Sequence, residues 1–197
     1  EDLRPKVKRR FTPRTTDSSH AQPVANNLLR RQFASPAVNR KWVADITYIR
    51  TDAGWLYLAG ILDLFSRRIV GWSMADHMEN QLTSDALEMA LRRRRPKAGL
   101  VHHSDRGLQY ACDAYRDRLE QHGIQMSMSG RGDCYDNAAM ESFWSTLKTE
   151  LVHQEHYASH AEARASIFEY IEVFYNRKRL HSSLGYVSPE AFEAAAN

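Results

Sequence analysis

Residues 42–49 read Trp-Val-Ala-Asp-Ile-Thr-Tyr-Ile, so two sets of side chains alternate along this stretch. A period of two, in a run rich in β-branched and aromatic residues, is typical of a β-strand. Asp45 lies in the middle and shares its face with Val43, Thr47 and Ile49. Burying an unpaired carboxylate on this largely apolar face is costly, so Asp45 needs a partner such as a metal ion, unless the strand lies at a solvated edge.

The chain on either side of this stretch predicts a mixed fold. Thr51 to Gly54 supplies turn chemistry, and the two apolar runs that follow predict a three-stranded antiparallel meander. Residues 129–136 are polar, contain two glycines and predict a loop. Strands followed by mixed strands and helices indicate an α/β or α+β domain with a mixed sheet. The expected elements after residue 54 are strands at 55–62, 68–74, 99–103 and 124–128, and helices at 82–91, 108–122 (ended by Gly123), 138–152 and 161–178.

Length and composition exclude several classes of protein. A chain of 197 residues can form one full-sized core but not several large domains. Its longest apolar run, residues 55–62, is far below the roughly 20 residues that span a bilayer, and no signal peptide opens the chain. Two cysteines without a CxxC pair favour a reducing, intracellular compartment. Because residue 1 is Glu, we expect a fragment of a longer protein.

Charge is distributed unevenly along the chain. Residues 1–40 carry nine Lys and Arg against three Asp and Glu, whereas the remaining residues carry 18 against 21. Four of the six prolines also lie in the first forty residues, which makes them a poor candidate for a packed core. This segment is predicted to be an arm that follows a polyanion, or else merely a soluble tail.

Two further acids stand where chemistry is common. Asp105 follows the strand predicted at 99–103, and the carboxyl ends of strands are where α/β folds place ligands; a helix-capping role is the alternative. In the helix predicted at 138–152, Glu141 and Lys148 share a polar stripe with Asn137 and Ser145. Acids from a strand centre, a strand end and a helix could converge on hard divalent cations such as Mg²⁺.

The spacing of these acids resembles a known signature. Fifty-nine residues separate Asp45 from Asp105, and thirty-five separate Asp105 from Glu141, as in the D,D(35)E motif of transposases and retroviral integrases. The words around the acids resemble those of the second-frame transposase of the IS3 family of bacterial insertion sequences. These words are Trp42-Val43-Ala44-Asp45-Ile46-Thr47-Tyr48, Leu62-Asp63-Leu64-Phe65-Ser66-Arg67, His103-Ser104-Asp105-Arg106-Gly107-Leu108-Gln109-Tyr110, Cys134-Tyr135-Asp136-Asn137-Ala138, Tyr175-Asn176 and Arg179-Leu180-His181.

The resemblance implies a fold, a reaction and a set of residues. The fold is ribonuclease H-like, with a mixed five-stranded sheet flanked by helices. Asp45, Asp105 and Glu141 are expected to hold two Mg²⁺ or Mn²⁺ ions, which suit an in-line displacement at phosphorus. Water first cuts a transposon end, and the freed 3′-OH then attacks target DNA. The resemblance also implies that Lys148 grips DNA phosphate. Arg131, Arg106 and Asn137 are further expected DNA contacts, with a purely structural loop as the alternative for Arg131.

The same resemblance implies partners and boundaries. The expected partner is DNA, both the transposon ends and the target. Joining two ends requires a homo-oligomer, at least a dimer. The expected location is the bacterial cytoplasm, in association with the nucleoid. We expect a basic arm at 1–38 with room for one short helix, a catalytic core at 39–155 and a helical extension at 156–197. No helix-turn-helix is recognisable before Asp45, although the family usually carries one. A nuclease of the same fold that only hydrolyses, and a non-catalytic DNA-binding remnant, remain alternatives.

Several neighbouring groups have simpler interpretations. Asp63 is expected to pair with Arg67 or Arg68 or to cap a turn, and Asp133 and Asp136 to cap the helix that follows. The basic run 92–95 favours equally a helix-dipole role and a DNA contact. The spacing of His153, His156 and His160 is read as coincidence, since no cysteine pair completes a zinc set. Ser188-Pro189 predicts a helix start.

Overall fold

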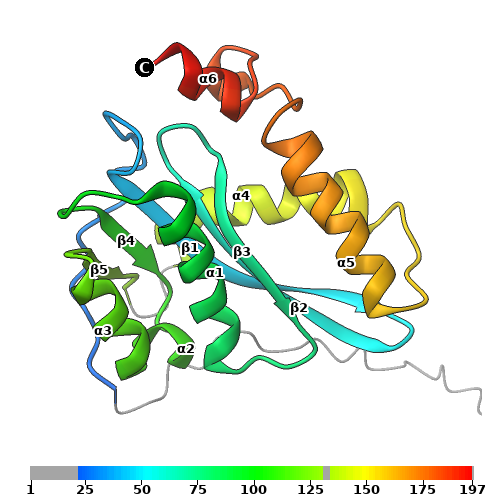
Figure 1. Ribbon diagram of the computed structural model, residues 1–197, viewed down its shortest axis with the longest axis horizontal. Helices are drawn as coiled ribbons and strands as arrows, with labels where there is room; N and C mark the ends of the chain where they lie inside the picture. The colour runs from blue at the N-terminus through cyan, green and yellow to red at the C-terminus, as the bar shows by residue number, and fades with distance from the viewer. Residues whose placement is uncertain (1–21, 131–133, 197) are drawn as a thin grey trace, which may run out of the picture.

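The computed structural model describes residues 22–130 and 134–196, built on a mixed five-stranded sheet (Figure 1). Strands β1 (Lys41–Thr51), β2 (Gly54–Asp63) and β3 (Ile69–Ala75) form the predicted antiparallel meander. The short strands β4 (Val101–Ser104) and β5 (Gln125–Met128) run parallel to β1 on its other side. The order β3-β2-β1-β4-β5 therefore places the strand of Asp45 at the centre.

Helices cover both faces of this sheet (Figure 1). One apolar cluster joins the sheet to α1 (Asn80–Arg94) and α3 (Asp113–Gln121). The other joins it to α4 (Ala138–Leu147) and α5 (His160–Glu169). Both faces are thus buried, which explains why both sets of side chains along β1 are largely apolar. The remaining elements are α2 (Leu108–Ala111), α6 (Pro189–Ala195), the 3₁₀ turns η1 (Cys134–Asn137) and η4 (Ser182–Leu184), and the π-helical turns η2 (Lys148–Val152) and η3 (Tyr170–Tyr175).

The helix predicted at 108–122 is wrong in one respect, because it breaks at Cys112. That residue has an extended backbone (φ −65°, ψ 148°) and separates α2 from α3. Tyr110 and Tyr115 lie on either side of the break, are 2% and 1% exposed, and pack edge to face 5.4 Å apart. Five residues apart on one straight helix, these rings would point about 140° away from each other. The break lets both enter the same core.

The described part of the N-terminal arm lies against the core. Leu29 is 1% exposed and belongs to the cluster beneath α4 and α5. The Lys41 ammonium donates hydrogen bonds to the carbonyl oxygens of Gln32 and Ala34. The division of the chain at residues 38 and 155 stays a prediction, but side chains from the arm take part in packing. No helix occurs between residues 22 and 40, and no helix among the described residues is long and apolar enough to cross a membrane.

Gly71 in β3 is expected to be essential for packing α1 on the sheet. A Cβ there would collide with the carbonyl oxygen of Ala86 and crowd Ala90. Because backbone atoms cannot yield, Gly71→Ala should lower the free energy of unfolding by about 1–3 kcal/mol in urea titrations. Asp85→Ala, on the exposed side of α1, should change it by less than about 0.5 kcal/mol. Equal stability of the two variants would contradict the close approach of α1 to β3.

Candidate active site

The sheet register brings Asp45 and Asp105 to the same level. Trp42 and Val43 of β1 pair with His102 and His103 of the parallel strand β4. Asp45 and Asp105 each lie two residues beyond the Val43–His103 pair. Since β4 ends at Ser104, Asp105 leaves the sheet at its carboxyl end, beside the middle of β1.

Two hydrogen bonds hold helix α4 over this position. Asn137, just before the helix, donates from Nδ2 to the carbonyl oxygen of Ala44 at 3.1 Å. Trp144 donates from its indole nitrogen to Oδ2 of Asp45 at 3.0 Å. Glu141 lies four residues after the first contact and three before the second, so all three share one helix face. Glu141 is therefore directed toward the strand that carries Asp45.

Glycine at position 60 makes this approach feasible. Gly60 pairs with Asp45 across β1 and β2. A Cβ at Gly60 would stand 2.8 Å from the Trp144 ring and 3.2 Å from the methyl group of Met140. The sequence indicated Trp144 only as part of an apolar stripe; nothing in the pattern revealed that its indole N–H binds an acid.

Electrostatics show that the three acids share one site. Burial raises the pKa of Asp45 to about 7, and the neighbouring charges of Asp105 and, more weakly, Glu141 contribute. The Ile46 N–H and the Trp144 indole oppose this shift of the Asp45 pKa by hydrogen bonding. Excess negative charge at partly buried carboxylates is what a divalent cation would relieve.

A nearby cation belongs to the same site. The Lys148 ammonium lies 4.8 Å from the centroid of the Tyr48 ring. Partial burial lowers the pKa of Lys148, whereas the charge of Asp45 raises it. Among the described residues no Lys or Arg forms a salt bridge with Asp45, so Lys148 acts on that acid only through space.

Backbone geometry fixes Asp105. Its Oδ1 accepts a hydrogen bond from the Gly107 N–H at 2.8 Å, and a Cβ on Gly107 would stand 2.9 Å from that oxygen. Arg106, the next residue, donates from Nε to the Ser129 carbonyl at 2.6 Å. Carboxylate oxygens are the type of ligand atom that hard divalent cations prefer. In the part of the chain that the structure describes, no three His, Cys, Asp or Glu side chains form a ready-made metal cluster.

Comparisons with known proteins decide the family. Residues 35–134 match the family described as "Integrase core domain", and residues 122–189 match a second model of that description. The chain is 55% identical over 190 residues to the "Insertion element IS600 uncharacterized 31 kDa protein" of Shigella sonnei (96% of this chain, 70% of that protein). It is 49% identical over 193 residues to "Transposase InsF for insertion sequence IS3A" of Escherichia coli strain K12 (98% and 67%). The chain belongs to the IS3-family transposases.

Solved structures agree on the fold of this transposase. A chain of the simian T-cell lymphotropic virus intasome superimposes with a TM-score of 0.68 at 14% identity, covering 91% of this chain and 61% of that one. The HTLV-2 integrase catalytic core domain, solved in complex with magnesium in a dimeric form, superimposes with a TM-score of 0.60 at 13% identity. The match covers 81% of this chain and 99% of that one. The predicted ribonuclease H-like fold is confirmed, and with the family match the enzyme is a DDE transposase.

The four predicted DNA contacts of the transposase differ in their position relative to the acids. Lys148 and Arg106 lie beside the acids, and both stay proposals. Arg131 lies outside the described residues. Asn137 is 6% exposed and its amide binds the Ala44 carbonyl, so the structure uses it to anchor α4 rather than to present it to DNA. We do not propose Asn137 further as a DNA contact.

Charged groups near the site find partners within the protein. Asp63 caps the turn after β2 by accepting the N–H of Phe65, as predicted, but its ionic partner is Arg94. It also accepts the N–H of Asn39, which precedes β1. Arg94 also binds Glu193 of α6. Within the basic run, Arg92 pairs with Glu88 and Arg93 with Glu172. The helix-dipole and DNA-contact interpretations of the run both stay predictions.

Asp136 is not the helix cap that the sequence predicted. Asp136 lies within the turn η1, one residue before the N-cap residue Asn137. It is 2% exposed and accepts hydrogen bonds from Asn27 Nδ2 at 2.7 Å and the Gly130 N–H at 3.0 Å. Asp133 lies outside the described residues. Ser188 does cap α6, accepting from the Ala191 N–H.

The carboxylate site predicts weak divalent-metal binding to this transposase. In calorimetric titration with Mn²⁺, Asp45→Asn or Asp105→Asn should remove most of the heat of binding, because each removes an oxygen ligand and a negative charge. Asp52→Asn, at an exposed acid beyond the site, is the matched control and should bind like the wild type. Unchanged binding in both site variants would contradict the metal assignment.

Proposed function

We propose that this transposase cuts DNA at the ends of an insertion sequence and joins the freed 3′-OH to target DNA. The observation that carries the proposal is the convergence of two acids on Asp45 of β1: Asp105 at the end of β4 and Glu141 of α4 lie close enough that their charges raise the pKa of Asp45. In the first step a water oxygen attacks the phosphorus and the bond to the 3′ oxygen breaks. In the second, that 3′ oxygen attacks a phosphorus of the target strand, and the bond between this phosphorus and the target's own 3′ oxygen breaks.

The residues of the chain divide this work. Asp45, Asp105 and Glu141 would hold Mg²⁺ or Mn²⁺, two ions by the chemistry of such sites. When bound, the ions activate the attacking oxygen and stabilise the leaving one. Trp144 and Gly107 orient Asp45 and Asp105 through their N–H groups. The magnesium complex of the HTLV-2 integrase core supports the choice of metal.

Lys148, Arg106 and Arg131 are proposed to hold the DNA. Lys148 supplies a point charge for a phosphate beside the acids. Joining two ends requires two active sites, so we also propose a homo-oligomer, which the dimeric and trimeric forms of the HTLV-2 core support. Since chromosomal DNA is the substrate, the place of action is the bacterial cytoplasm at the nucleoid.

A joining assay on pre-cut ends tests this function. Incubated with Mn²⁺ and pre-cut duplex ends, the wild type should produce joined products that Asp105→Asn does not. Cleavage of uncut ends without joining would instead identify a nuclease that only hydrolyses. DNA binding without either product would identify a non-catalytic remnant.

Glu141 and Lys148 should fail in different ways. Glu141→Gln should abolish cleavage and joining while end DNA binds at least as tightly, because a negative charge facing phosphate is lost. Lys148→Ala should weaken binding first, and its joining rate should recover at high DNA concentration or low salt. Affinity and joining rate are measured for both variants in one Mn²⁺ buffer. A Lys148→Ala protein that binds normally but does not join would show that Lys148 acts in the chemical step.

The basic arm should contribute to the salt dependence of DNA binding. Residues 1–21 carry six Lys and Arg against three Asp and Glu, and their removal spares Leu29 in the core. Deleting them should make the slope of log affinity against log salt shallower, because fewer counterions are released from DNA. Affinity is measured over a salt series for both lengths of chain. An unchanged slope would show that the arm does not touch DNA.

A further inference from the structure

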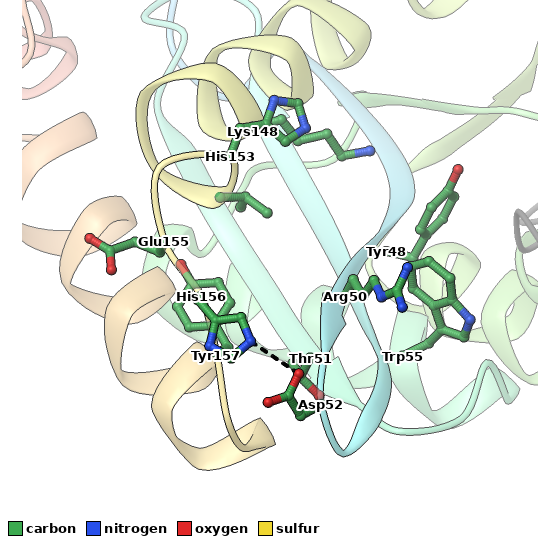
Figure 2. Close-up of a pocket in the computed structure, with 11 residues that line it drawn as sticks. Tyr48, Arg50, Thr51, Asp52, Trp55, Lys148, His153, Glu155, His156 and Tyr157 are labelled. Atoms are coloured by element: carbon green, nitrogen blue, oxygen red, sulfur yellow. Dashed lines mark hydrogen bonds and ion pairs between the residues drawn. The ribbon is translucent and has the colours of Figure 1, made fainter. Parts of the chain in front are cut away.

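An open groove continues from the acids along strand β1. Its volume is about 550 Å³, within the range of about 300–1,000 Å³ typical of small-molecule sites. Tyr48, Arg50 and Trp55 line it from the hairpin of β1 and β2 (Figure 2). Lys148 and His156 line it from η2 and the segment that follows. Because Lys148 also senses the charge of Asp45, the groove and the acids are neighbours.

The groove exists because β4 is short. Strand β4 pairs with Lys41–Val43 alone, so among the described residues the second half of β1 has β2 as its one partner strand. The segment after η2 crosses near the end of this hairpin and is fixed there. Asp52 donates from its N–H to the Tyr157 carbonyl at 2.9 Å, and its carboxylate lies 3.1 Å from Nε2 of His156.

Charge within the groove is segregated. Arg50 is exposed, and no hydrogen bond or ion pair engages its guanidinium among the described residues. Lys148 makes only its cation–π contact with Tyr48 there. Of the two acids lining the groove, Asp52 is paired with His156, and Figure 2 shows the Glu155 carboxylate directed away from Lys148 and Arg50. Two cations that form no ion pair among the described residues therefore lie beside the aromatic wall.

That wall consists of Tyr48 and Trp55. Their rings pack edge to face, with centroids 5.2 Å apart and planes at 87°, and both side chains are partly exposed. Exposed aromatic rings beside unpaired cations are the chemistry that binds single-stranded nucleic acid, since bases stack on rings while cations hold phosphates. A base within a duplex cannot stack this way because its faces are covered by its neighbours.

We propose that this groove holds one unpaired nucleotide of the DNA next to the scissile phosphate. Its base stacks against Trp55 and Tyr48, and its phosphate lies between Lys148 and Arg50. This inference rests on the proposed function and adds that the enzyme opens the duplex at the reacting end. Unpairing costs least where a base pair is terminal or mismatched, so the groove favours ends that open readily.

A double-mutant cycle between Trp55 and the DNA bases tests the proposal. The probes are duplexes with the terminal sequence of the encoding element, each with one abasic position, and their affinities are measured with the wild type and Trp55→Ala. At one position near the cut, the abasic change should weaken wild-type binding about tenfold but leave Trp55→Ala unaffected. Tyr186→Ala, at a tyrosine that is 71% exposed on the C-terminal extension, is the matched control and should behave like the wild type.

Further measurements keep the test independent of folding defects. Trp55→Phe, which keeps a stacking ring, should retain part of the coupling. The wild type itself should bind a duplex mismatched at the coupled position more tightly than the matched duplex.

Equal abasic effects in wild type and Trp55→Ala at every position, with joining intact, would overturn the proposal and leave a groove that contacts only duplex phosphates. A wild type that binds ends but does not join them, while still showing the coupling, would overturn the proposed function and not the groove.

Discussion

The hydrogen bond from the Trp144 indole to Asp45 determines how the two halves of the site meet. A carboxylate at the centre of a sheet buried on both faces is tolerated only if its charge is offset. Trp144 supplies one donor, and it reaches Asp45 only because Gly60 leaves the opposite strand without a side chain. The same contact sets the rotation and height of α4, and with them the direction of Glu141.

The N-terminal arm reinforces strand β4, which ends just before Asp105. The hydroxyl oxygen of Ser127 accepts N–H groups from Leu28 and Leu29, so its hydrogen is free for Nδ1 of His103 at 2.8 Å. Burial lowers the pKa of His103 to about 4, which keeps the ring neutral, and Nε2 then donates to Ser129. Each group in this series of hydrogen bonds acts consistently as donor or acceptor at each contact. The arm, β5 and β4 therefore form one rigid edge beside the acids.

What the sequence could predict depended on local patterns. The alternation along 42–49, the meander and the spacing of Asp45, Asp105 and Glu141 were readable because each is a repeat or a fixed distance along the chain. The break at Cys112 could not be predicted in this way. It allows the rings of Tyr110 and Tyr115 to pack against each other, and this contact exists only in the folded core. The role of Asp136 was also hidden, since its partner Asn27 lies 109 residues away.

The C-terminal family motifs, Tyr175-Asn176 and Arg179-Leu180-His181, are explained by structural contacts with the end of α4 and with the sheet. Arg179 donates to both carboxylate oxygens of Glu150, at 2.6–3.0 Å, and the Tyr170 hydroxyl donates to one of them at 2.7 Å. Tyr175 packs edge to face against Phe143 of α4, with ring centroids 4.7 Å apart. These contacts hold the helix at its middle and just past its end.

Asn176 completes the attachment of the C-terminal extension. Its amide accepts from the Ile69 N–H at 2.9 Å and donates to the Ile69 carbonyl at 3.0 Å. This imitates a neighbouring strand at the exposed edge of β3, which would otherwise offer unpaired groups to another chain. The C-terminal extension therefore contacts both the β3 edge of the sheet and helix α4. The short helix α4, which carries Glu141, thereby gains rigidity from contacts outside its own length.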